Sequence, residues 1–359
     1  MRSLFTLGIL VAVVSCQKKE APPPPAAGPA AEPPKPTAAI DPGRLGLFQP
    51  PLPAAFESPA NPLTEEKIAL GRMLYYDKRL SKNHDISCNS CHDLARFGVD
   101  NQKVSPGHRK QLGSRNSPSV YNAAGHFAQF WDGRAPTVEE QAKGPVLNPV
   151  EMAMPNEQRV LATLRSMPAY VAAFRKAFPA DKDPITWDNM ARAIGAFERK
   201  LVTPARWDRF LAGEADALSE AEKIGFNTFV QVGCPTCHLG TLVGGTQYQK
   251  AGLVVPWPEQ KDQGRYEVTK QEGDRMLFKV PSLRNVARTA PYFHDGSVAT
   301  LEEAVRRMAR HQLGKELSEQ DTSAIVTWLQ SLTGEIPQAY IQAPELPPST
   351  AKTPKPDPS

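Results

Sequence analysis

Two copies of the pattern Cys-x-x-Cys-His, at residues 88–92 and 234–238, constrain this chain more than any other feature of its sequence. In each copy, two thiols three residues apart can add to the vinyl groups of a haem, and the histidine that follows can reach the iron from the proximal side. The residues that would form thioethers are Cys88, Cys91, Cys234 and Cys237, and the proximal ligands would be His92 and His238. The two patterns therefore predict two covalently bound haem c groups.

Two other structures would also use these cysteines. One is a zinc site built from both Cys-x-x-Cys pairs, and the other is a pair of local disulfides. The pairs lie too far apart in the sequence for a zinc ribbon, and neither alternative explains why a histidine follows each pair. We therefore expect haem at both patterns.

The beginning of the chain resembles a lipoprotein signal peptide. Residues 1–15 contain an early arginine and an apolar run, and Cys16 follows at the position where such a signal is cleaved and the new terminus is lipidated. An ordinary secretory signal and a short hydrophobic anchor are the alternatives, although the apolar run is short for a membrane span. All three interpretations place the protein outside the cytoplasm, so we expect the periplasm and a lipid anchor at a membrane.

The remaining chain divides by composition. Proline and alanine dominate residues 16–62, which we expect to form a semi-rigid tether, and residues 341–359 are expected to be a disordered tail. Between them, residues 63–202 and 203–340 each contain one haem pattern and are long enough for a domain. The net charge of +4 is spread along the chain, so nothing indicates nucleic-acid binding.

The hydrophobic periodicity predicts a mainly α-helical fold with little strand. Helices are expected at 64–77, at 188–201, from Ser219 to Phe229, and after Thr300 and Ser318, because serine and threonine cap helix starts. A helix before each haem pattern and another one later in the chain is the layout of a c-type cytochrome domain. The sequence therefore predicts two such domains, each with one haem.

The sixth ligands of the two irons cannot be chosen by spacing alone. The candidates are His84, His108, His126, His294, His311 and the methionines. A methionine on an amphipathic helix, such as Met308, more often belongs to a hydrophobic core than to a metal site.

Several longer strings resemble those of the bacterial di-haem cytochrome c peroxidases. They are Trp131-Asp132-Gly133-Arg134-Ala135, Gly144-Pro145, Glu151-Met152, Val280-Pro281-Ser282-Leu283-Arg284-Asn285-Val286 and Pro291-Tyr292-Phe293-His294-Asp295-Gly296. They keep their order relative to both haem patterns and are far more specific than those patterns, and the resemblance as a whole covers most of residues 64–335.

The resemblance implies different roles for the two haems. The N-terminal haem would be the low-potential peroxidatic site, capped in the resting enzyme by His108 of the Gly107-His108 pair. The C-terminal haem would receive the electrons and have Met308 as its sixth ligand. Since a thioether ligand raises the potential of the iron, this assignment agrees with the direction of electron flow.

The resemblance also implies catalytic and calcium-binding residues. Glu151 would move a proton between the two oxygens of the peroxide, Gln141 would orient the peroxide, and Trp131 would lie between the haems. A calcium ion between the domains would be bound by Asn116, Thr289 and Pro291, mainly through uncharged oxygens.

The function implied is the reduction of hydrogen peroxide to water, with electrons from a small soluble cytochrome c or blue-copper protein, usually by a homodimer. Two alternatives stay open. One is a di-haem electron-transfer cytochrome without peroxidase activity. The other is a di-haem oxidase of the methylamine-dehydrogenase maturation type, in which a tyrosine replaces the methionine ligand, so Met308 argues against it. Whether the second haem must be reduced for activity is also open.

Overall fold

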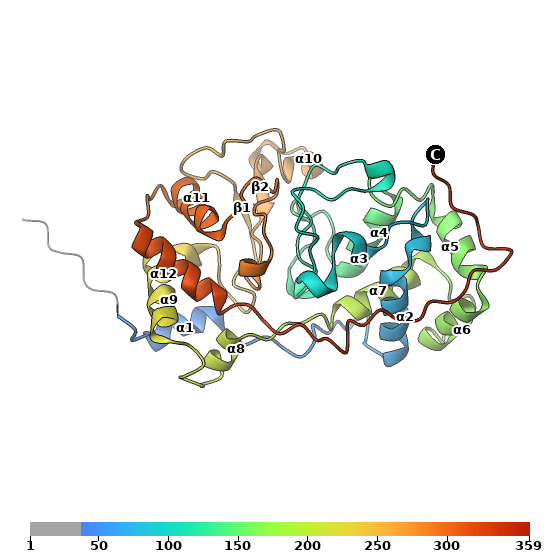
Figure 1. Ribbon diagram of the computed structural model, residues 1–359, viewed down its shortest axis with the longest axis horizontal. Coiled ribbons are helices and arrows are strands. Elements are labelled where there is room, and N and C mark those ends of the chain that lie inside the picture. Colours follow the sequence, from blue (N-terminus) through green and yellow to red (C-terminus); the bar gives the residue numbers. More distant parts are fainter. Residues whose placement is uncertain (1–36) are drawn as a thin grey trace, which may run out of the picture. The chain divides into compact units, whose positions relative to one another are not determined.

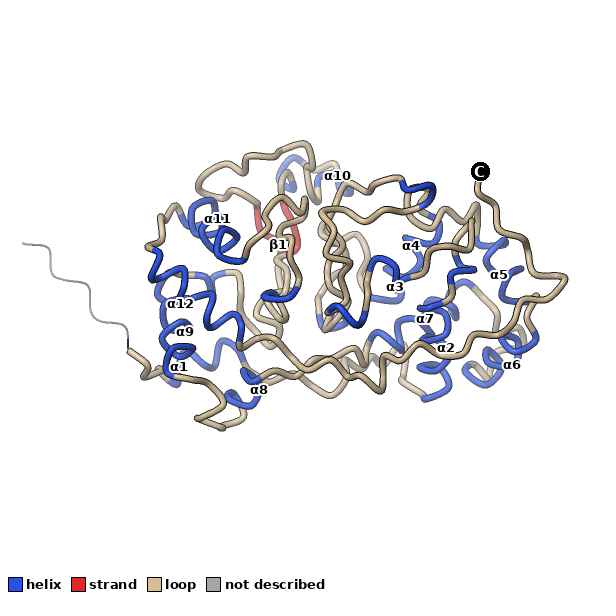
Figure 2. Tube along the Cα trace, viewed as in Figure 1, coloured by secondary structure: helices blue, strands red, loops and turns tan. Residues whose placement is uncertain are grey.

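Helices and long loops make up nearly all of residues 37–359, the part of the chain that the computed structural model describes (Figures 1 and 2). The helices are α1 Pro42–Leu45, α2 Glu65–Tyr76, α3 Cys88–Cys91, α4 Val138–Leu147, α5 Glu157–Arg165, α6 Pro168–Ala177, α7 Trp187–Glu198, α8 Arg206–Leu211, α9 Glu220–Val232, α10 Tyr266–Thr269, α11 Leu301–Leu313 and α12 Glu319–Gln330. Two short antiparallel strands, β1 Tyr248–Lys250 and β2 Leu277–Lys279, form the one sheet of the described residues. The expectation of a mainly α-helical chain is confirmed.

The predicted helix starts are confirmed by their caps. Thr64, Ser219, Thr300 and Ser318 each accept a hydrogen bond from the backbone N–H three residues further on. Glu222 accepts a bond in return from the backbone N–H of Ser219, at 2.9 Å, which completes a capping box. These helix starts were predictable because both partners of each cap lie within one helical turn.

In the first half of the described chain, residues 63–202, the backbones of α2 and α7 approach each other closely where the two helices cross. A Cβ atom on Gly71 would collide with the carbonyl oxygen of Ala193, so the crossing requires glycine. One turn further along α2, the ring of Tyr75 packs edge-on against Phe197, with 5.4 Å between the ring centroids. The helix before the first haem pattern is thereby fixed against the last helix of this half.

In the second half, residues 203–340, α9 and α12 cross in the same way. A Cβ atom on Gly225 would collide with the carbonyl oxygen of Ala324, and Phe229, one turn further on, packs against Trp328 with centroids 4.4 Å apart. The same order of glycine, aromatic residue and haem pattern thus occurs in both halves. This repetition supports the prediction of two similarly built domains.

Each half has its own buried hydrophobic cluster. In the first half, α2, α4, α5, α6 and α7 contribute fully buried side chains, among them Leu74, Phe174 and Met190. In the second half, Trp207 and Trp328 form the centre of a cluster with residues of α9, α11 and α12. The haem patterns therefore lie beside separate hydrophobic cores.

The expectation of a tether over the whole of residues 16–62 is wrong for 37–62. Phe48 is completely buried in the core of the second half, 5.3 Å from Phe226 and 5.7 Å from Trp207 between ring centroids. The high proline content of this stretch concealed Phe48 as an anchoring aromatic residue, whose burial stabilises the docked segment. Residues 16–36 lie outside the described part of the chain.

Residues 341–359 were expected to be disordered, and this prediction is also wrong. The segment runs along the first half, beside α2, α5 and α6 (Figure 1). Arg79 donates a hydrogen bond of 2.7 Å to the carbonyl oxygen of Pro347, and the hydroxyl of Thr350 donates one of 2.9 Å to that of Ser166. A proline-rich extended segment has carbonyl oxygens but few N–H groups, so neighbouring side chains can bind it by donating hydrogen bonds, without a β-sheet.

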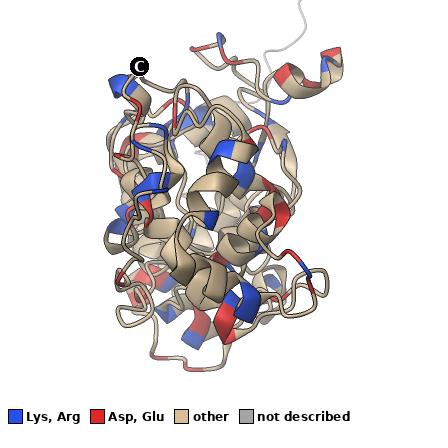
Figure 3. Cartoon of the chain, turned by 90° about the vertical axis from the view of Figure 1, so that its right-hand side faces the viewer, with Lys and Arg blue, Asp and Glu red and all other residues tan. Residues whose placement is uncertain are grey.

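The predicted signal peptide at 1–15 and the lipidation site Cys16 lie outside the described residues. Within residues 37–359, none of the helices combines the length and the hydrophobicity that crossing a bilayer requires. Lys and Arg are interspersed with Asp and Glu in the view of Figure 3, in line with the spread of charge along the sequence.

Candidate haem centres and the residues between them

The second haem pattern opens into a cavity of about 270 Å³. Cys234, Cys237 and His238 line it, and so does Met308, which α11 contributes from a position 70 residues further along the chain. Leu301 and Ala304, on the same face of α11, also border the cavity. The structure therefore brings the predicted proximal and sixth ligands of the second haem to one site.

The ring of His238 has the orientation and the protonation state that a metal ligand requires. Its Nδ1 lies 3.4 Å from the carbonyl oxygen of Val243, and burial lowers the pKa of His238 to about 4. The imidazole is thus neutral near pH 7 and has Nδ1 directed to the backbone, which leaves Nε2 as the ligating atom.

The first haem pattern shows the same arrangement. Cys88 and Cys91 begin and end α3, and Nδ1 of His92 lies 3.0 Å from the carbonyl oxygen of Pro118. Burial lowers the pKa of His92, so this ring is also neutral. The hydroxyl of Tyr75, from α2, donates a 2.7 Å hydrogen bond to the His92 carbonyl and fixes the backbone of the pattern.

The chemistry of the cysteines fits thioether formation. The four cysteines of the two patterns are free and partly buried. Burial raises the pKa of the Cys91 thiol to about 11 and that of Cys234 to about 12. Cys88 packs against a hydrophobic cluster of the first half and Cys234 against one of the second half, whereas a single zinc site built from both pairs would need all four sulfurs at one point.

A buried lysine gives a second indication that a haem fits the cavity. Lys279 lines the cavity and has no acidic partner among the described residues; its Nζ lies 3.3 Å from Nδ1 of His126. Burial lowers the pKa of Lys279 to about 8. A buried ammonium group is costly without a counter-charge, and the two propionates of a haem would supply one.

Glu151, the predicted acid–base residue, lies in the turn that follows α4. The side-chain amide of Asn148 donates a 2.9 Å hydrogen bond to its Oε1. Burial raises the pKa of Glu151, against the opposing effects of Arg134 and Asn148. Glu151 is also close enough to the first haem pattern for its charge to contribute, after burial, to the raised pKa of Cys91.

Gln141 lies on α4 and is partly buried. Its side chain makes no hydrogen bond to the described residues, Glu151 included. The structure therefore leaves its role in orienting a substrate as a prediction.

His108 is buried, with 4 % of its surface exposed, and its loop packs against the turn that carries Glu151. A Cβ atom on Gly107 would collide with the carbonyl oxygen of Val150, and the backbone N–H of His108 donates a 2.7 Å bond to the carbonyl of Glu151. The imidazole Nε2 lies 3.1 Å from the carbonyl oxygen of Ser359. The structure thus shows His108 bound by the segment 341–359, and its role as an iron ligand stays a prediction.

Trp131 lies where the two halves meet. Its indole N–H donates a 2.9 Å hydrogen bond to the carbonyl of Asn116, and its own carbonyl accepts one of 2.8 Å from the N–H of Lys279. The ring also faces that of His294 at 6.4 Å between centroids. Residues of the second half thus contact Trp131 directly, as its predicted position between the haems requires.

The three residues predicted to bind calcium line the same cavity. The amide nitrogen of Asn116 donates to the carbonyl of Gln102 at 2.9 Å, so its Oδ1 is free for another partner. Neither this atom nor the carbonyl oxygens of Thr289 and Pro291 accept a hydrogen bond from the described residues. Uncharged oxygen donors of this kind suit a weakly bound calcium ion.

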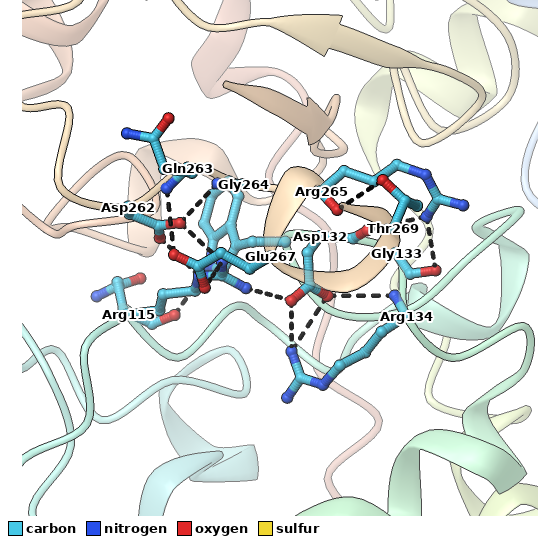
Figure 4. A network of polar contacts seen from close by, with 12 residues as sticks. Arg115, Asp132, Gly133, Arg134, Asp262, Gln263, Gly264, Arg265, Glu267 and Thr269 are labelled. Atoms are coloured by element: carbon cyan, nitrogen blue, oxygen red, sulfur yellow. Dashed lines mark hydrogen bonds and ion pairs between the residues drawn. The ribbon is translucent and has the colours of Figure 1, made fainter. Parts of the chain in front are cut away.

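An ion-pair network around Arg115 was not predicted from the sequence (Figure 4). Arg115 donates to Asp132 at 2.5 Å and to both carboxylate oxygens of Asp262 at 2.6 and 2.7 Å. Asp132 belongs to the first half and Asp262 to a loop of the second half, 147 positions from Arg115. The sequence offered one indication of this network: Arg115 and Asp132 are the direct neighbours of the predicted site residues Asn116 and Trp131. The spacing of residues gave no indication that Asp262 would be their partner.

Comparison with known proteins agrees with this geometry. Residues 65–216 match the family model described as di-haem cytochrome c peroxidase. The chain is 46 % identical to the cytochrome c551 peroxidase of Pseudomonas aeruginosa, over 86 % of this chain and 90 % of the relative, and 46 % identical to that of Nitrosomonas europaea, over 83 % and 88 %. A solved structure of a MauG-like protein associated with microbial copper homeostasis superimposes with a TM-score of 0.72 at 31 % identity, over 83 % of this chain and 97 % of the other. These similarities confirm the resemblance seen in the sequence, and the chain belongs to the bacterial di-haem cytochrome c peroxidase family.

Proposed function

We propose that this protein reduces hydrogen peroxide to water at its first haem pattern, with two electrons and two protons consumed per peroxide. The observation that carries this proposal is the half-buried Glu151, whose pKa is raised by burial, in a turn that is hydrogen-bonded to the loop of His108. An electron carrier has no need of such a carboxylate, whereas cleavage of a peroxide bond requires a group that accepts and returns a proton.

Two haem c groups would be held by the thiols and the proximal histidines of the two patterns, and when bound they supply the binding of peroxide and the storage of electrons. Glu151 would take the proton from the inner oxygen of the peroxide and deliver it to the outer oxygen. Asn148 holds Glu151 in place, at 2.9 Å, and Gln141 would orient the peroxide. The raised pKa of Glu151 suits it to both directions of proton transfer.

Electrons would come from a small soluble redox protein, either a monohaem cytochrome c or a blue-copper protein. His238 and Met308, which line one cavity, would hold the second haem, and that haem would supply a high-potential site that receives the electrons. Trp131 would lie on the path between the haems. A calcium ion bound by Asn116, Thr289 and Pro291 would couple the two halves where Trp131 contacts both.

His108 would be the removable sixth ligand of the first haem. In the resting protein His108 would keep the first haem closed to peroxide, and withdrawal of the imidazole would follow reduction of the second haem. The loop Gly107-His108 is attached through backbone contacts to the turn of Glu151, so a change in the loop reaches the acid–base residue directly.

The proposed location is the periplasm, with the mature chain anchored to a membrane through a lipid on Cys16 and assembled as a homodimer. The pattern of residues 1–16 supports the anchor, and the covalent attachment of haem at Cys-x-x-Cys-His supports a location outside the cytoplasm.

The first experiment is absorption and EPR spectroscopy of the purified holoprotein, oxidised and then half-reduced in the presence of calcium, followed by peroxide. We expect a low-spin signal to be lost on half-reduction, a high-spin haem to form, and peroxide to be consumed rapidly. Two haems that stay low-spin and do not react with peroxide would instead identify an electron-transfer cytochrome. A high-valent state formed without prior reduction would identify an oxidase of the maturation type.

A further inference from the structure

Ser359 contacts the side chain of His108, and Lys82 contacts both Ser359 and Asp357. The carbonyl oxygen of Ser359 accepts two hydrogen bonds, one of 3.1 Å from Nε2 of His108 and one of 2.7 Å from Nζ of Lys82. The backbone N–H of Asp357 donates a 2.9 Å bond to the Lys82 carbonyl, and its carboxylate lies 3.5 Å from Nζ. Lys82 therefore holds the segment at both Asp357 and Ser359.

This group of residues is connected to the predicted catalytic turn. The backbone N–H of Lys82 donates a 2.8 Å hydrogen bond to the carbonyl of Met152, and the N–H of His108 donates one of 2.7 Å to the carbonyl of Glu151. Lys82 and His108 are thus fixed to adjacent residues of one turn. The position of the imidazole relative to Glu151 is set by this short chain of bonds, which residues 357–359 close on the outer side.

The bond to Ser359 and a bond to iron exclude one another. A carbonyl oxygen only accepts hydrogen bonds, so Nε2 of His108 must carry a proton to bind Ser359. A ligating nitrogen must present its lone pair to the metal, and its ring Nδ1 would carry the proton instead. One nitrogen cannot serve both partners at the same time.

We propose that residues 357–359 and Lys82 form a docking site for the His108 imidazole away from the iron, and that this site stabilises the state in which the first haem is open to peroxide. The inference rests on the proposed function, because it takes His108 as the removable sixth ligand. Lys82 acts as a positioning residue, since it holds Ser359 in place to accept the bond from His108. A protein that loses the docking site will populate the His-ligated state more strongly.

The test is the spin state of the first haem in half-reduced holoprotein, measured by EPR over a calcium titration. In Lys82→Met, the methylene chain remains, but the two hydrogen bonds of the ammonium group to Ser359 and its ion pair with Asp357 are lost. We expect the ratio of His-ligated to open haem to rise roughly tenfold, as follows from the loss of one or two hydrogen bonds, and the reaction with peroxide to slow in proportion. Deletion of residues 355–359 should shift the ratio in the same direction.

The matched control is Lys355→Met, which removes a positive charge from the same segment. The side chain of Lys355 is exposed and makes no hydrogen bond or ion pair with the described residues, so the spin-state ratio should not change. In oxidised His108→Ala protein the low-spin signal of the first haem should be absent, and in the half-reduced form of this variant the addition of Lys82→Met should have no further effect on the spin state.

The outcomes separate the two hypotheses. If His108→Ala abolishes the low-spin signal but Lys82→Met and the deletion leave the ratio unchanged, the docking site is refuted and the role of His108 as a ligand stands. If His108→Ala retains the low-spin signal, His108 is not the ligand, and both the proposed gating and the docking site are refuted.

Discussion

Replacement of Glu151 by glutamine tests the catalytic proposal with little change to the structure. Glutamine has nearly the same size, and its amide oxygen can still accept the 2.9 Å hydrogen bond from Asn148. What Glu151→Gln removes is the ability to accept a proton from the peroxide. Positioned acid–base groups contribute about 10²- to 10⁴-fold to rates, so the reaction with peroxide should slow by that factor, equivalent to about 3–5 kcal/mol in the barrier.

The pH dependence of the reaction rate provides a second, independent test of the role of Glu151. Burial raises the pKa of Glu151, so the protonated form persists to a higher pH than for an exposed glutamate. The base form is the active one at the start of the reaction, and the rate should therefore rise as pH increases through this raised pKa and fall below it. In Glu151→Gln this limb of the pH profile should be absent.

The assay is stopped-flow mixing of half-reduced holoprotein with hydrogen peroxide, with the haem spectrum as readout. Glu157→Gln is the control, because Glu157 lies on α5, close in sequence, and forms no hydrogen bond or ion pair through its side chain among the described residues. A rate for Glu151→Gln within threefold of the wild type, with an unchanged pH profile, would refute the assignment of Glu151 as the acid–base residue.

Three further predictions concern the fold and the contact between the halves. Phe48→Ala should lower the free energy of unfolding by about 3–5 kcal/mol in denaturant titrations, because it empties a fully buried aromatic site; a change below 1 kcal/mol would show that the segment around Phe48 is a loose tether after all. Burial alone would raise the pKa of Glu139, but its hydrogen bonds to Arg199, at 2.8 and 2.9 Å, lower it below the usual range. The stability gained from this depressed pKa is fully present above the pKa that Glu139 has in the unfolded chain, and it is lost as the pH falls through the pKa that Glu139 has in the folded protein. Glu139→Gln should therefore lower the free energy of unfolding by about 3–5 kcal/mol near pH 7 and by much less in acid. An equal loss at both pH values would contradict this. Trp131→Phe removes the 2.9 Å hydrogen bond to the Asn116 carbonyl and part of the aromatic contact between the halves. Flash photolysis should then show that electron transfer between the haems is slowed about tenfold, the order expected from the loss of one positioning hydrogen bond. An unchanged rate would exclude Trp131 from the electron-transfer path.

Much of the site could be predicted from the sequence because its chemistry is local. Cys-x-x-Cys-His places two thiols and an imidazole within five residues, and in both copies Nδ1 of the histidine lies near a backbone carbonyl oxygen, which leaves Nε2 for a metal. The helix starts at Thr64 and Ser219 were equally predictable, since a cap joins residues three positions apart. The resemblance to the peroxidases then suggested His238 and Met308 as a pair, and the fold brings them to one cavity.

The tertiary structure alone decided how distant segments meet. Phe48 is buried in the second half although proline surrounds it in the sequence, residues 341–359 are bound to the first half, and Arg115 pairs with Asp262 across 147 positions. The sequence determined which groups carry the chemistry, because bonds within one turn depend only on neighbouring residues. The partners of Phe48, Arg115 and His108 depend on which surfaces remain after the two cores have packed, and no local pattern of residues records that outcome.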